Sequence, residues 1–320
     1  MADAARRLES VGIIREAGFR EGRRGGVAVL YELNVDRGHS LGIAIGQTSI
    51  GVVARDFAGG IITEMGEPLS PSGSADDAIL AADRLIRQAN EMAASPLLAA
   101  AVYVAHPVDR SGQTLSLRDS PFPAWHFDPR NDLDLGPVAA VRVDNDVNWA
   151  AVAERHLGSM MNCDDFVYIH LGSGLGAGIF SSGELMRGHR GLAGEVGYVR
   201  KSDAQDITQR LASLGLGSKS RYGLDVAATT RVFTDPALRD QAELALSELS
   251  LLIANLATLL NTQAIVFGGP LSNVEPLMAA LYTRIPTLTL DAPRMEMSCQ
   301  SSLTGASLIA GRMAHELFGF

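Results

Sequence analysis

The stretch Leu171-Gly-Ser-Gly-Leu-Gly-Ala-Gly178 decides the fold of this chain. It ends the alternating apolar segment 167–171, which predicts a strand, and after a glycine-rich turn it enters a second predicted strand over 177–180. The same arrangement of two strands occurs earlier, over 41–54, with its turn at Gly46-Gln-Thr48. A hairpin with a glycine-rich tip that occurs twice indicates two related lobes.

Helices are expected between and after these strands, because apolar residues recur there at helical spacing. The predicted helices are 75–92, 148–157, 237–260 and 304–317. Strands and helices in this order are typical of α/β lobes packed around a cleft. We therefore expect an N-terminal lobe of residues 37–156 with 303–320 and a C-terminal lobe of residues 157–302.

Glycine-rich turns at strand ends suit the binding of phosphate groups, because backbone N–H groups can approach an anion where no Cβ is in the way. Strand ends are also where α/β sheets bind ligands. The candidate phosphate-contacting residues are Gly46, Thr48, Gly172, Ser173, Gly174, Gly268 and Gly269. The residues alone leave another interpretation open, in which these glycines only form turns.

The ordered set of motifs resembles the ROK family, which contains bacterial repressors, open reading frames and sugar kinases. The matching stretches are 41–46, 144–148 with Glu154, 171–178, 188–197 and 266–269. The most specific of them is Ala193-Gly-Glu-Val-Gly197. The resemblance implies a two-lobed actin-like, hexokinase-like (ribonuclease H-like) α/β fold and a homodimer. Residues 2–33 resemble the end of the family's DNA-binding module.

The chemistry that this resemblance implies is phosphoryl transfer from ATP to a sugar hydroxyl, which needs a carboxylate near the attacking hydroxyl and a metal on the phosphates. The resemblance puts Asp146 at the position of the general base, Asn145 on the sugar hydroxyls, and Glu195 on hydroxyls near the anomeric end. Carboxylates suit this task because they only accept hydrogen bonds. From the residues alone, Asp146 is equally well a helix N-cap and Glu195 an ordinary surface glutamate.

The first glycine-rich turn departs from the family's kinases. It reads Ala44-Ile-Gly-Gln-Thr-Ser49, where the kinases carry an aspartate at the first of these positions and a lysine at the last. Ala44 cannot hold the water shell of a magnesium ion, and Gln47 crowds a glycine position. Because metal ions supply several kcal/mol to such reactions, we expect this turn to be a vestige of a nucleotide site.

Sugar-contacting and zinc-binding positions of the family are changed as well. Tyr198 stands where a histidine contacts both sugar and zinc, Gln209 aligns with a sugar-binding glutamate, and Pro121 replaces a sugar-binding asparagine. The family's cysteine-rich zinc loop is missing, since Cys163 and Cys299 are the only cysteines and stand apart. We therefore expect no zinc and no other metal. The expected ligand site consists of Asn145, Asp146, Glu195, Tyr198 and Gln209.

The N-terminal region is basic, although the chain is acidic. Residues 1–26 hold six arginines against four carboxylates, whereas the whole chain has a net charge of −9 and repels nucleic acid. A predicted helix, strand, basic turn at 20–26 and second strand give the order of the last part of a winged helix-turn-helix. Residues 1–36 are thus expected to form a partial winged helix that contacts DNA in a longer form of the protein. The expected DNA-contacting residues are Arg6, Arg7, Arg23 and Arg24. The alternative is an ordinary solvated charged face.

Composition excludes several other classes of protein. Apolar residues make up 47% of the chain and charged residues 20%, which is typical of a globular protein and not of a disordered one. The longest apolar run, 97–105, is too short for a membrane span, which needs about 20 residues. No apolar segment of a signal peptide follows Met1. Two cysteines exclude a disulfide framework and fit the cytoplasm.

The favoured interpretation is a ROK-type transcription regulator that senses a sugar or another small molecule in a cleft lined by Asn145, Asp146 and Glu195, without a cofactor. Ligand binding would shift the arrangement of the lobes in a homodimer. The first alternative is an ATP-dependent, glucokinase-like sugar kinase, with Asp146 as the catalytic base and ATP with magnesium required. The second is a degenerate ROK protein that binds neither sugar nor DNA.

Overall fold

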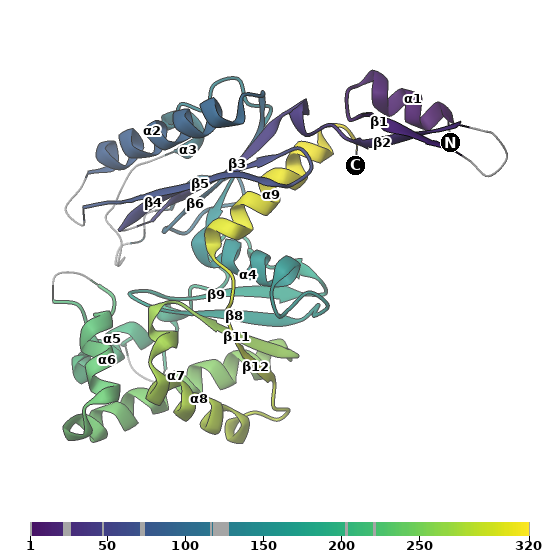
Figure 1. The fold of residues 1–320 in the computed structure, drawn as a ribbon. Coiled ribbons are helices and arrows are strands. Elements are labelled where there is room, and N and C mark those ends of the chain that lie inside the picture. Colours follow the sequence, from purple (N-terminus) through teal and green to yellow (C-terminus); the bar gives the residue numbers. More distant parts are fainter. Residues whose placement is uncertain are drawn as a thin grey trace. The chain divides into compact units, whose positions relative to one another are not determined.

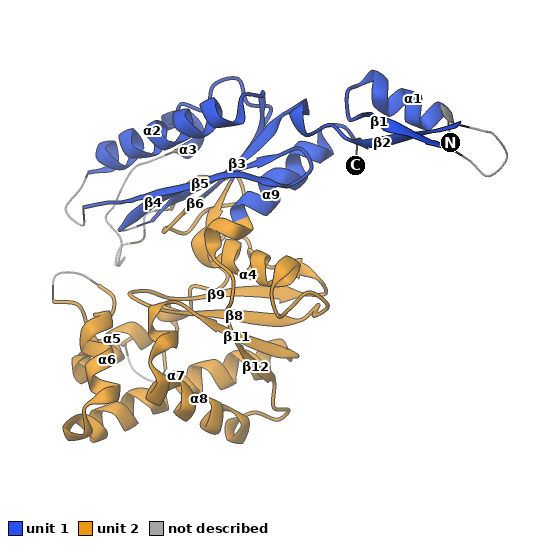
Figure 2. Cartoon of the chain, in the orientation of Figure 1, with its two compact units in different colours: residues 1–102, 129–142, 306–320 blue, residues 103–128, 143–305 orange. Residues whose placement is uncertain are grey.

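The structure is a computed structural model that describes residues 2–21, 27–46, 48–70, 74–115, 117, 128–201, 204–219 and 222–319 (Figure 1). The chain forms two compact units, each built from separate stretches (Figure 2). Unit 1 comprises Met1–Val102, Pro129–Arg142 and Ala306–Phe320, and unit 2 comprises Tyr103–Asp128 and Val143–Gly305. These limits differ from the lobe limits expected at residues 156 and 302, because the helix that starts at Asp146 packs on the sheet of unit 2.

Unit 1 is built on a five-stranded sheet with the strand order β5-β4-β3-β6-β7. The strands are β3 (His39–Ile45), β4 (Ser49–Asp56), β5 (Ile61–Pro68), β6 (Leu97–Val104) and β7 (Ala140–Asn145). Strand β4 pairs antiparallel with both β3 and β5, so the strands expected over 41–54 are confirmed. Helix α2 (Ala75–Ala93) contacts β4 and β5. Helix α9 (Ser302–Glu316) packs so closely on β3 that a Cβ on Gly42 would lie 2.6 Å from the backbone of Ser307.

Unit 2 has a second five-stranded sheet, with the strand order β10-β9-β8-β11-β12. The strands are β8 (Phe166–Leu171), β9 (Leu175–Ser181), β10 (Glu184–Leu185), β11 (Ala264–Gly268) and β12 (Arg294–Met297). Strands β8 and β9 form an antiparallel hairpin, whereas β11 lies between β8 and β12 and runs parallel to both. The hairpin expected at the second glycine-rich stretch is therefore confirmed.

Helices cover both faces of the sheet of unit 2 (Figure 1). The helices are α4 (Asp146–Leu157), α5 (Ile207–Leu211), α6 (Val226–Thr234), α7 (Arg239–Leu260) and α8 (Glu275–Leu288). Helix α4 contacts β8 and β9, and the other four helices lie on the opposite face. Shorter helices occur in both units. Unit 1 contains η1 (Val35–Arg37) and α3 (Pro129–Asp132), and unit 2 contains η2 (Val196–Tyr198), η3 (Ala212–Leu216), η4 (Pro236–Leu238) and η5 (Pro270–Asn273). The four helices expected from periodicity correspond to α2, α4, α7 and α9, with ends that differ by no more than two residues.

Helix α7 is the central helix of the core of unit 2. Its buried Leu249 and Ile253 belong to the same apolar cluster as Ile169 of β8 and Phe267 of β11. Within the part of the chain that the structure describes, one stretch, Pro236–Leu260, is long and apolar enough to cross a membrane. Half of its most apolar window is buried inside unit 2, which is the environment of a core helix.

The N-terminal head consists of helix α1 (Ala2–Ser10) and a hairpin of β1 (Ile14–Glu21) and β2 (Val27–Leu33). The expected order of a helix and two strands is confirmed. Strand β1 is longer than expected, because its pairing with β2 continues as far as Glu21 and includes Arg20, which the sequence placed in a basic turn. The interpretation of the head as part of a winged helix stays a prediction.

Two of the four expected DNA-contacting arginines can be located. Arg6 and Arg7 are exposed on α1, and Arg6 lies 3.6 Å from the carboxylate of Asp3. Arg23 and Arg24 lie outside the described residues, as do Gln47 and Pro121.

Candidate functional site

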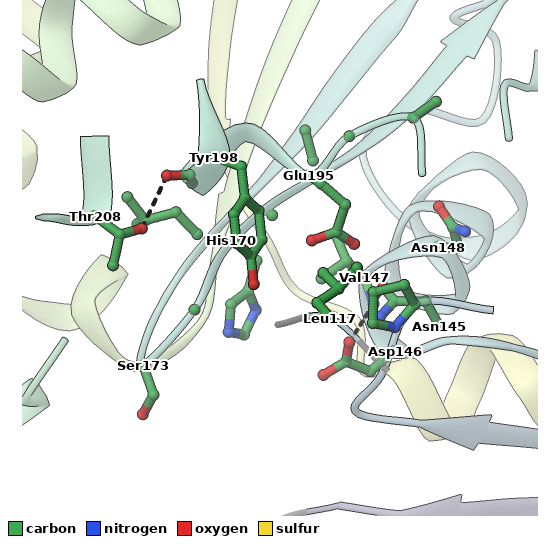
Figure 3. Close-up of a pocket in the computed structure, with 18 of the residues that line it drawn as sticks. Leu117, Asn145, Asp146, Val147, Asn148, His170, Ser173, Glu195, Tyr198 and Thr208 are labelled. Carbon is green, nitrogen blue, oxygen red and sulfur yellow. Dashed lines mark hydrogen bonds between the residues drawn. The ribbon is translucent and has the colours of Figure 1, made fainter. Parts of the chain in front are cut away.

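A pocket lies within unit 2, where several segments distant in the sequence meet (Figure 3). They are the junction of β7 with α4, the tip of the β8–β9 hairpin, the loop from Gly191 to Tyr198, and α5 with nearby Tyr222. Four expected ligand residues line it, together with two residues of the second glycine-rich turn. These are Asn145, Asp146, Glu195, Tyr198, Ser173 and Gly174.

Asn145 and Asp146 open helix α4 and face the pocket. Asn145 is the N-cap, since its Oδ1 accepts a hydrogen bond from the backbone N–H of Val147 at 2.9 Å. Its Nδ2 donates to the backbone oxygen of His106 at 3.1 Å, so both ends of this amide are already engaged. Asp146 Oδ1 also accepts from the Val147 N–H, at 2.9 Å. The sequence leaves open whether this pair caps the helix or lines a ligand site. In the structure the pair does both, since these side chains accept hydrogen bonds from the first turn of α4 and also line the pocket.

Buried Asp144 holds the first turn of α4 in place through hydrogen bonds. Its Oδ1 accepts hydrogen bonds from Asn148 Nδ2 at 2.7 Å and from the backbone N–H of Asn145 at 2.9 Å. Asn148 also lines the pocket. Asp144 thus orients two pocket residues without itself being in the lining.

Glu195 reaches the pocket because the backbone before it packs closely on β9. Gly194 has a positive φ of +93°, and a Cβ there would lie 1.9 Å from the backbone oxygen of Ala177, so only glycine allows this approach. Burial raises the pKa of Glu195 to about 7, and the nearby charge of Asp146 adds to the shift. Near neutral pH this carboxyl group is therefore divided between its protonated and ionised forms.

Two tyrosines form one wall of the pocket. The rings of Tyr198 and Tyr222 are stacked, with centroids 5.3 Å apart and planes inclined by 12°. The Tyr222 hydroxyl and Thr208 Oγ1 both donate to the backbone oxygen of Gly197, at 3.4 and 3.0 Å. Tyr222 and Thr208 line the pocket but were not expected from the sequence, because their contacts to 197–198 span many residues and leave no local pattern.

The structure does not place Gln209, an expected ligand residue, in the lining of the pocket. The Gln209 side chain accepts a hydrogen bond from the backbone N–H of Asp206 at 3.1 Å. The backbone N–H of Gln209 donates to Asp206 Oδ1 at 2.8 Å. These two bonds form the capping box of α5. The neighbouring Thr208 lines the pocket instead.

Helix α5 is tied to the core helix α7 by a largely buried carboxylate. Glu248 accepts hydrogen bonds from Arg210 Nη2 at 2.6 Å and from Lys201 Nζ at 3.3 Å. The bond from Arg210 is the main reason why the pKa of Glu248 lies below its ordinary value. Since Lys201 follows Tyr198 closely and Arg210 follows Thr208, this cluster anchors both segments that carry the pocket wall.

His170, the next-to-last residue of β8, is a pocket residue that the sequence interpretation missed. Figure 3 shows its ring, the carboxylates of Asp146 and Glu195, and the Tyr198 hydroxyl pointing toward a common space. Burial lowers the pKa of His170, and burial raises the pKa of Asp146. The signal that could have found His170 is a polar residue near the end of an apolar strand, two positions before the first glycine of a glycine-rich turn.

The other glycine-rich segments lie outside this pocket. Gly46 and Thr48 belong to the β3–β4 turn of unit 1, where the Gly46 N–H donates to the backbone oxygen of Ser49 at 3.0 Å. Gly268 ends β11, and a Cβ on it would lie 2.0 Å from the Tyr168 hydroxyl. Its neighbour Gly269 has a positive φ of +86°.

The residues of the first turn do not fit a magnesium–nucleotide complex. Ala44 is buried in β3 and offers only a methyl group where a carboxylate would be needed. Within the described ranges, no group of three His, Cys, Asp or Glu residues is placed to hold a metal ion. The thiol of Cys163 is buried, which raises its pKa, and it donates to Gln263 Oε1 at 3.3 Å. Cys299 is exposed.

Known proteins resemble this chain over much of its length. The sequence profile of the ROK family matches residues 40–209, more than half of the chain. The xylose repressor of Caldicellulosiruptor bescii is 27% identical over 200 residues, which are 61% of this chain and 50% of that protein. A beta-glucoside kinase of Listeria monocytogenes is 43% identical over 74 residues, which are 23% of this chain and 25% of the kinase. The chain therefore matches half or less of the length of these relatives.

The fold is shared with a solved ROK family transcriptional regulator, described as a homolog of the E. coli MLC protein. The TM-score is 0.70 at 20% identity, over 98% of this chain and 88% of that chain. The expected two-lobed α/β fold of the actin-like and hexokinase-like type is thereby confirmed. Among the curated relatives are both a repressor and a sugar kinase. Because the profile, the order of the motifs and the fold agree, the chain belongs to the ROK family.

Proposed function

We propose that this protein is a ROK-type transcription regulator whose effector is a sugar or a similar polyhydroxy molecule bound in the pocket of unit 2. The observation that carries the proposal is the presence of Asp146 and Glu195 in one pocket whose described lining residues include no Lys or Arg. Ionised carboxylates only accept hydrogen bonds, so they need donors from a ligand, and sugar hydroxyls supply them. The stacked Tyr198 and Tyr222 add a flat wall suited to the apolar face of a sugar ring.

The first glycine-rich turn favours a regulator over a kinase. Phosphoryl transfer depends on a metal ion that neutralises charge on the phosphates, and Ala44 supplies no ligand for it. A regulator needs only that its ligand bind two states of the protein with different affinities. The likeness to a xylose repressor over 61% of the chain supports this choice.

The basic head supports a role in DNA binding. Arg6 and Arg7 are exposed on α1, and the pair of Arg6 with Asp3 is itself exposed, so both guanidinium groups are accessible to phosphates. We propose that they act together with Arg23 and Arg24, and that the protein works as a homodimer, whose two-fold symmetry would match a palindromic operator.

Calorimetric titration with glucose, xylose and cellobiose tests the ligand part of the proposal. We expect saturable binding of at least one sugar, and Glu195→Gln should weaken it about tenfold or more, because a hydrogen bond to a charged group is worth about 1.5–3 kcal/mol. Glu184→Gln is the matched control, since Glu184 is an exposed residue of β10 in the same unit. Equal affinity of the wild type and Glu195→Gln for every sugar bound would contradict the proposal.

The DNA part is tested by selecting fragments of genomic DNA that bind the protein, with and without the sugar found by calorimetry. The proposal expects a preferred sequence whose affinity changes when the sugar is present, because effector and operator affinities are linked. Binding of DNA that is indifferent to both sequence and sugar would refute a regulatory role.

A sugar kinase is the second candidate, and one observation favours it. A beta-glucoside kinase is 43% identical to this chain over 74 residues. A coupled assay with ATP and each of the three sugars tests it. Turnover at an ordinary enzyme rate, about 1–10³ per second, would establish the kinase and overturn the regulator.

A further inference from the structure

The ring of His170 lies between two glycine turns of unit 2. A Cβ built on Gly172 would lie 2.6 Å from His170 Nε2, and a Cβ built on Gly269 would lie 3.0 Å from His170 Cε1. His170 and Gly268 are partners in the parallel pairing of β8 with β11, so both turns follow the same level of the sheet. The imidazole therefore fills the space directly in front of the backbone of Gly172 and Gly269.

A phosphate group that approached the two turns from this side would meet the imidazole. Glycine turns bind phosphate because their backbone can be approached without hindrance, and here the approach is taken by a side chain of the same unit. The second turn is also closed on itself, since the Gly172 N–H donates to the backbone oxygen of Gly174 at 3.2 Å.

The charged groups of the pocket also disfavour a phosphate ligand. Asp146 and Glu195 share the lining with His170, and none of the described lining residues is Lys or Arg. A polyphosphate placed here would meet two carboxyl groups and, because burial lowers the pKa of His170, an imidazole that is mostly uncharged at neutral pH. These lining side chains therefore suit an uncharged ligand better than a polyphosphate.

We propose that His170 is a specificity-determining residue that takes the place of nucleotide phosphates in unit 2, so that the pocket accepts an uncharged polyhydroxy ligand alone. This inference rests on the proposed function of the same pocket and deepens it. The imidazole both blocks the two turns and presents a ring nitrogen to the ligand from the side where a kinase would hold its phosphate donor.

The test is calorimetric titration of the full chain with magnesium–ADP and with inorganic tripolyphosphate. We expect no saturable binding by the wild type at millimolar concentration, and we expect His170→Gly to bind ADP at least about tenfold more tightly, a gain of about 1.4 kcal/mol. Glu184→Gln is the matched control, because Glu184 is an exposed residue of β10 in the same unit and lies in neither glycine turn. It should bind ADP no better than the wild type.

Two results would overturn the inference. One is binding of ADP by the wild type as tight as that of His170→Gly, and the other is a folded His170→Gly protein, judged by circular dichroism, that gains no ADP affinity. Saturable binding of ADP by the wild type at millimolar concentration would overturn the inference without any variant. If His170→Gly misfolds, His170→Thr makes a milder change at the same position, and a folded His170→Thr protein that gains no ADP affinity would overturn the inference as well. Sugar binding, measured in parallel, reports on the proposed function separately: a wild type that binds no sugar and no ADP refutes that function and, with it, the ligand class assigned here.

Discussion

Arg187 holds one oxygen of the buried Asp144 with a hydrogen bond from Nε at 2.8 Å and an ion-pair contact from Nη2 at 2.7 Å. The Asp144 side chain is 3% exposed and the Arg187 side chain 23%. The other Asp144 oxygen holds Asn148 and the backbone of Asn145. This ion pair therefore connects the start of α4, where the candidate ligand residues begin, to the loop that leads to Glu195.

Removing the cation should destabilise unit 2, because Asp144 would stay buried without its ionic partner. We expect Arg187→Met to lower the free energy of unfolding by about 2–4 kcal/mol, as for other buried pairs that lose one member. Urea unfolding of the variant and the wild type measures this difference in the free energy of unfolding. The matched control is Arg284→Met, whose pair with Glu243 lies on the surface of the same unit and should be worth about 0–1 kcal/mol. Equal losses in both variants would show that the Asp144 pair has no special role.

The raised pKa of Glu195 predicts a pH dependence of stability. Its folded pKa of about 7 lies above its ordinary value of 4.5, so its contribution is fully present below pH 4.5 and is lost as the pH rises through 7. Each pKa unit corresponds to about 1.4 kcal/mol, and solvent reduces this for a half-buried group, so we expect about 1–2 kcal/mol in all. Glu195→Gln should match the wild type at pH 4 and exceed it by this amount at pH 8. The free energy of unfolding is measured with urea at each pH. If its difference between the variant and the wild type were the same at every pH, the raised pKa of Glu195 would be contradicted.

Ligand affinity should depend on pH in the opposite direction. A hydroxyl of the ligand donates to the ionised carboxylate, so binding of the sugar favours the form that predominates above pH 7. We expect the affinity to rise between pH 6 and pH 8 and then to level off. The rise should be absent in Glu195→Gln, where Asp146 and His170 still titrate. A rise of the same size in that variant would assign the effect to Asp146 or His170 instead.

The Glu248 cluster predicts a separate effect at the other side of the pocket wall. Glu248→Gln removes the charge that Arg210 and Lys201 share, and we expect a loss of about 1–3 kcal/mol in stability. Because the pKa of Glu248 is lowered, this contribution is present above pH 4.5 and disappears as the pH falls through the folded value. The difference between variant and wild type in urea unfolding should therefore shrink toward acid pH. Glu243→Gln, at the surface of the same helix, should cost less than about 1 kcal/mol at every pH.

The sequence predicts the elements with a clear period and misses those without one. Strands β3, β8 and β9 alternate or adjoin glycine-rich turns, and α7 carries an apolar stripe. Strand β6 was not assigned, because its run from Leu97 to Val104 is uniformly apolar and such a run does not separate a strand from a buried helix segment. Helix α8 is not among the helices predicted from periodicity, and it contains Pro276 at its start and Pro286 near its end, a residue type that disfavours a helix interior.

The candidate site divides in the same way. Asn145, Asp146 and Glu195 stand in motifs that the resemblance to the ROK family assigns to the ligand site, whereas the residues alone leave Asp146 as a helix cap and Glu195 as a surface residue. Thr208 and Tyr222 reach the pocket through hydrogen bonds to Gly197, and such contacts between distant segments are made by tertiary packing alone. Gln209 shows the reverse case, because its aligned position predicts a ligand residue, whereas its side chain completes the capping box of α5.

The last prediction concerns zinc. Structural zinc sites need four Cys or His ligands at short spacings, and the segment after Tyr198 offers none. This segment is held instead by the contact of Arg200 with Asp206 and by the ion pairs of Glu248. We therefore expect the purified protein to contain far less than one zinc per chain, and a chelator to leave its urea unfolding midpoint unchanged, because no folding energy comes from metal binding. Near-stoichiometric zinc that resists dialysis, together with a lower midpoint after chelation, would show that other residues of the chain form a metal site.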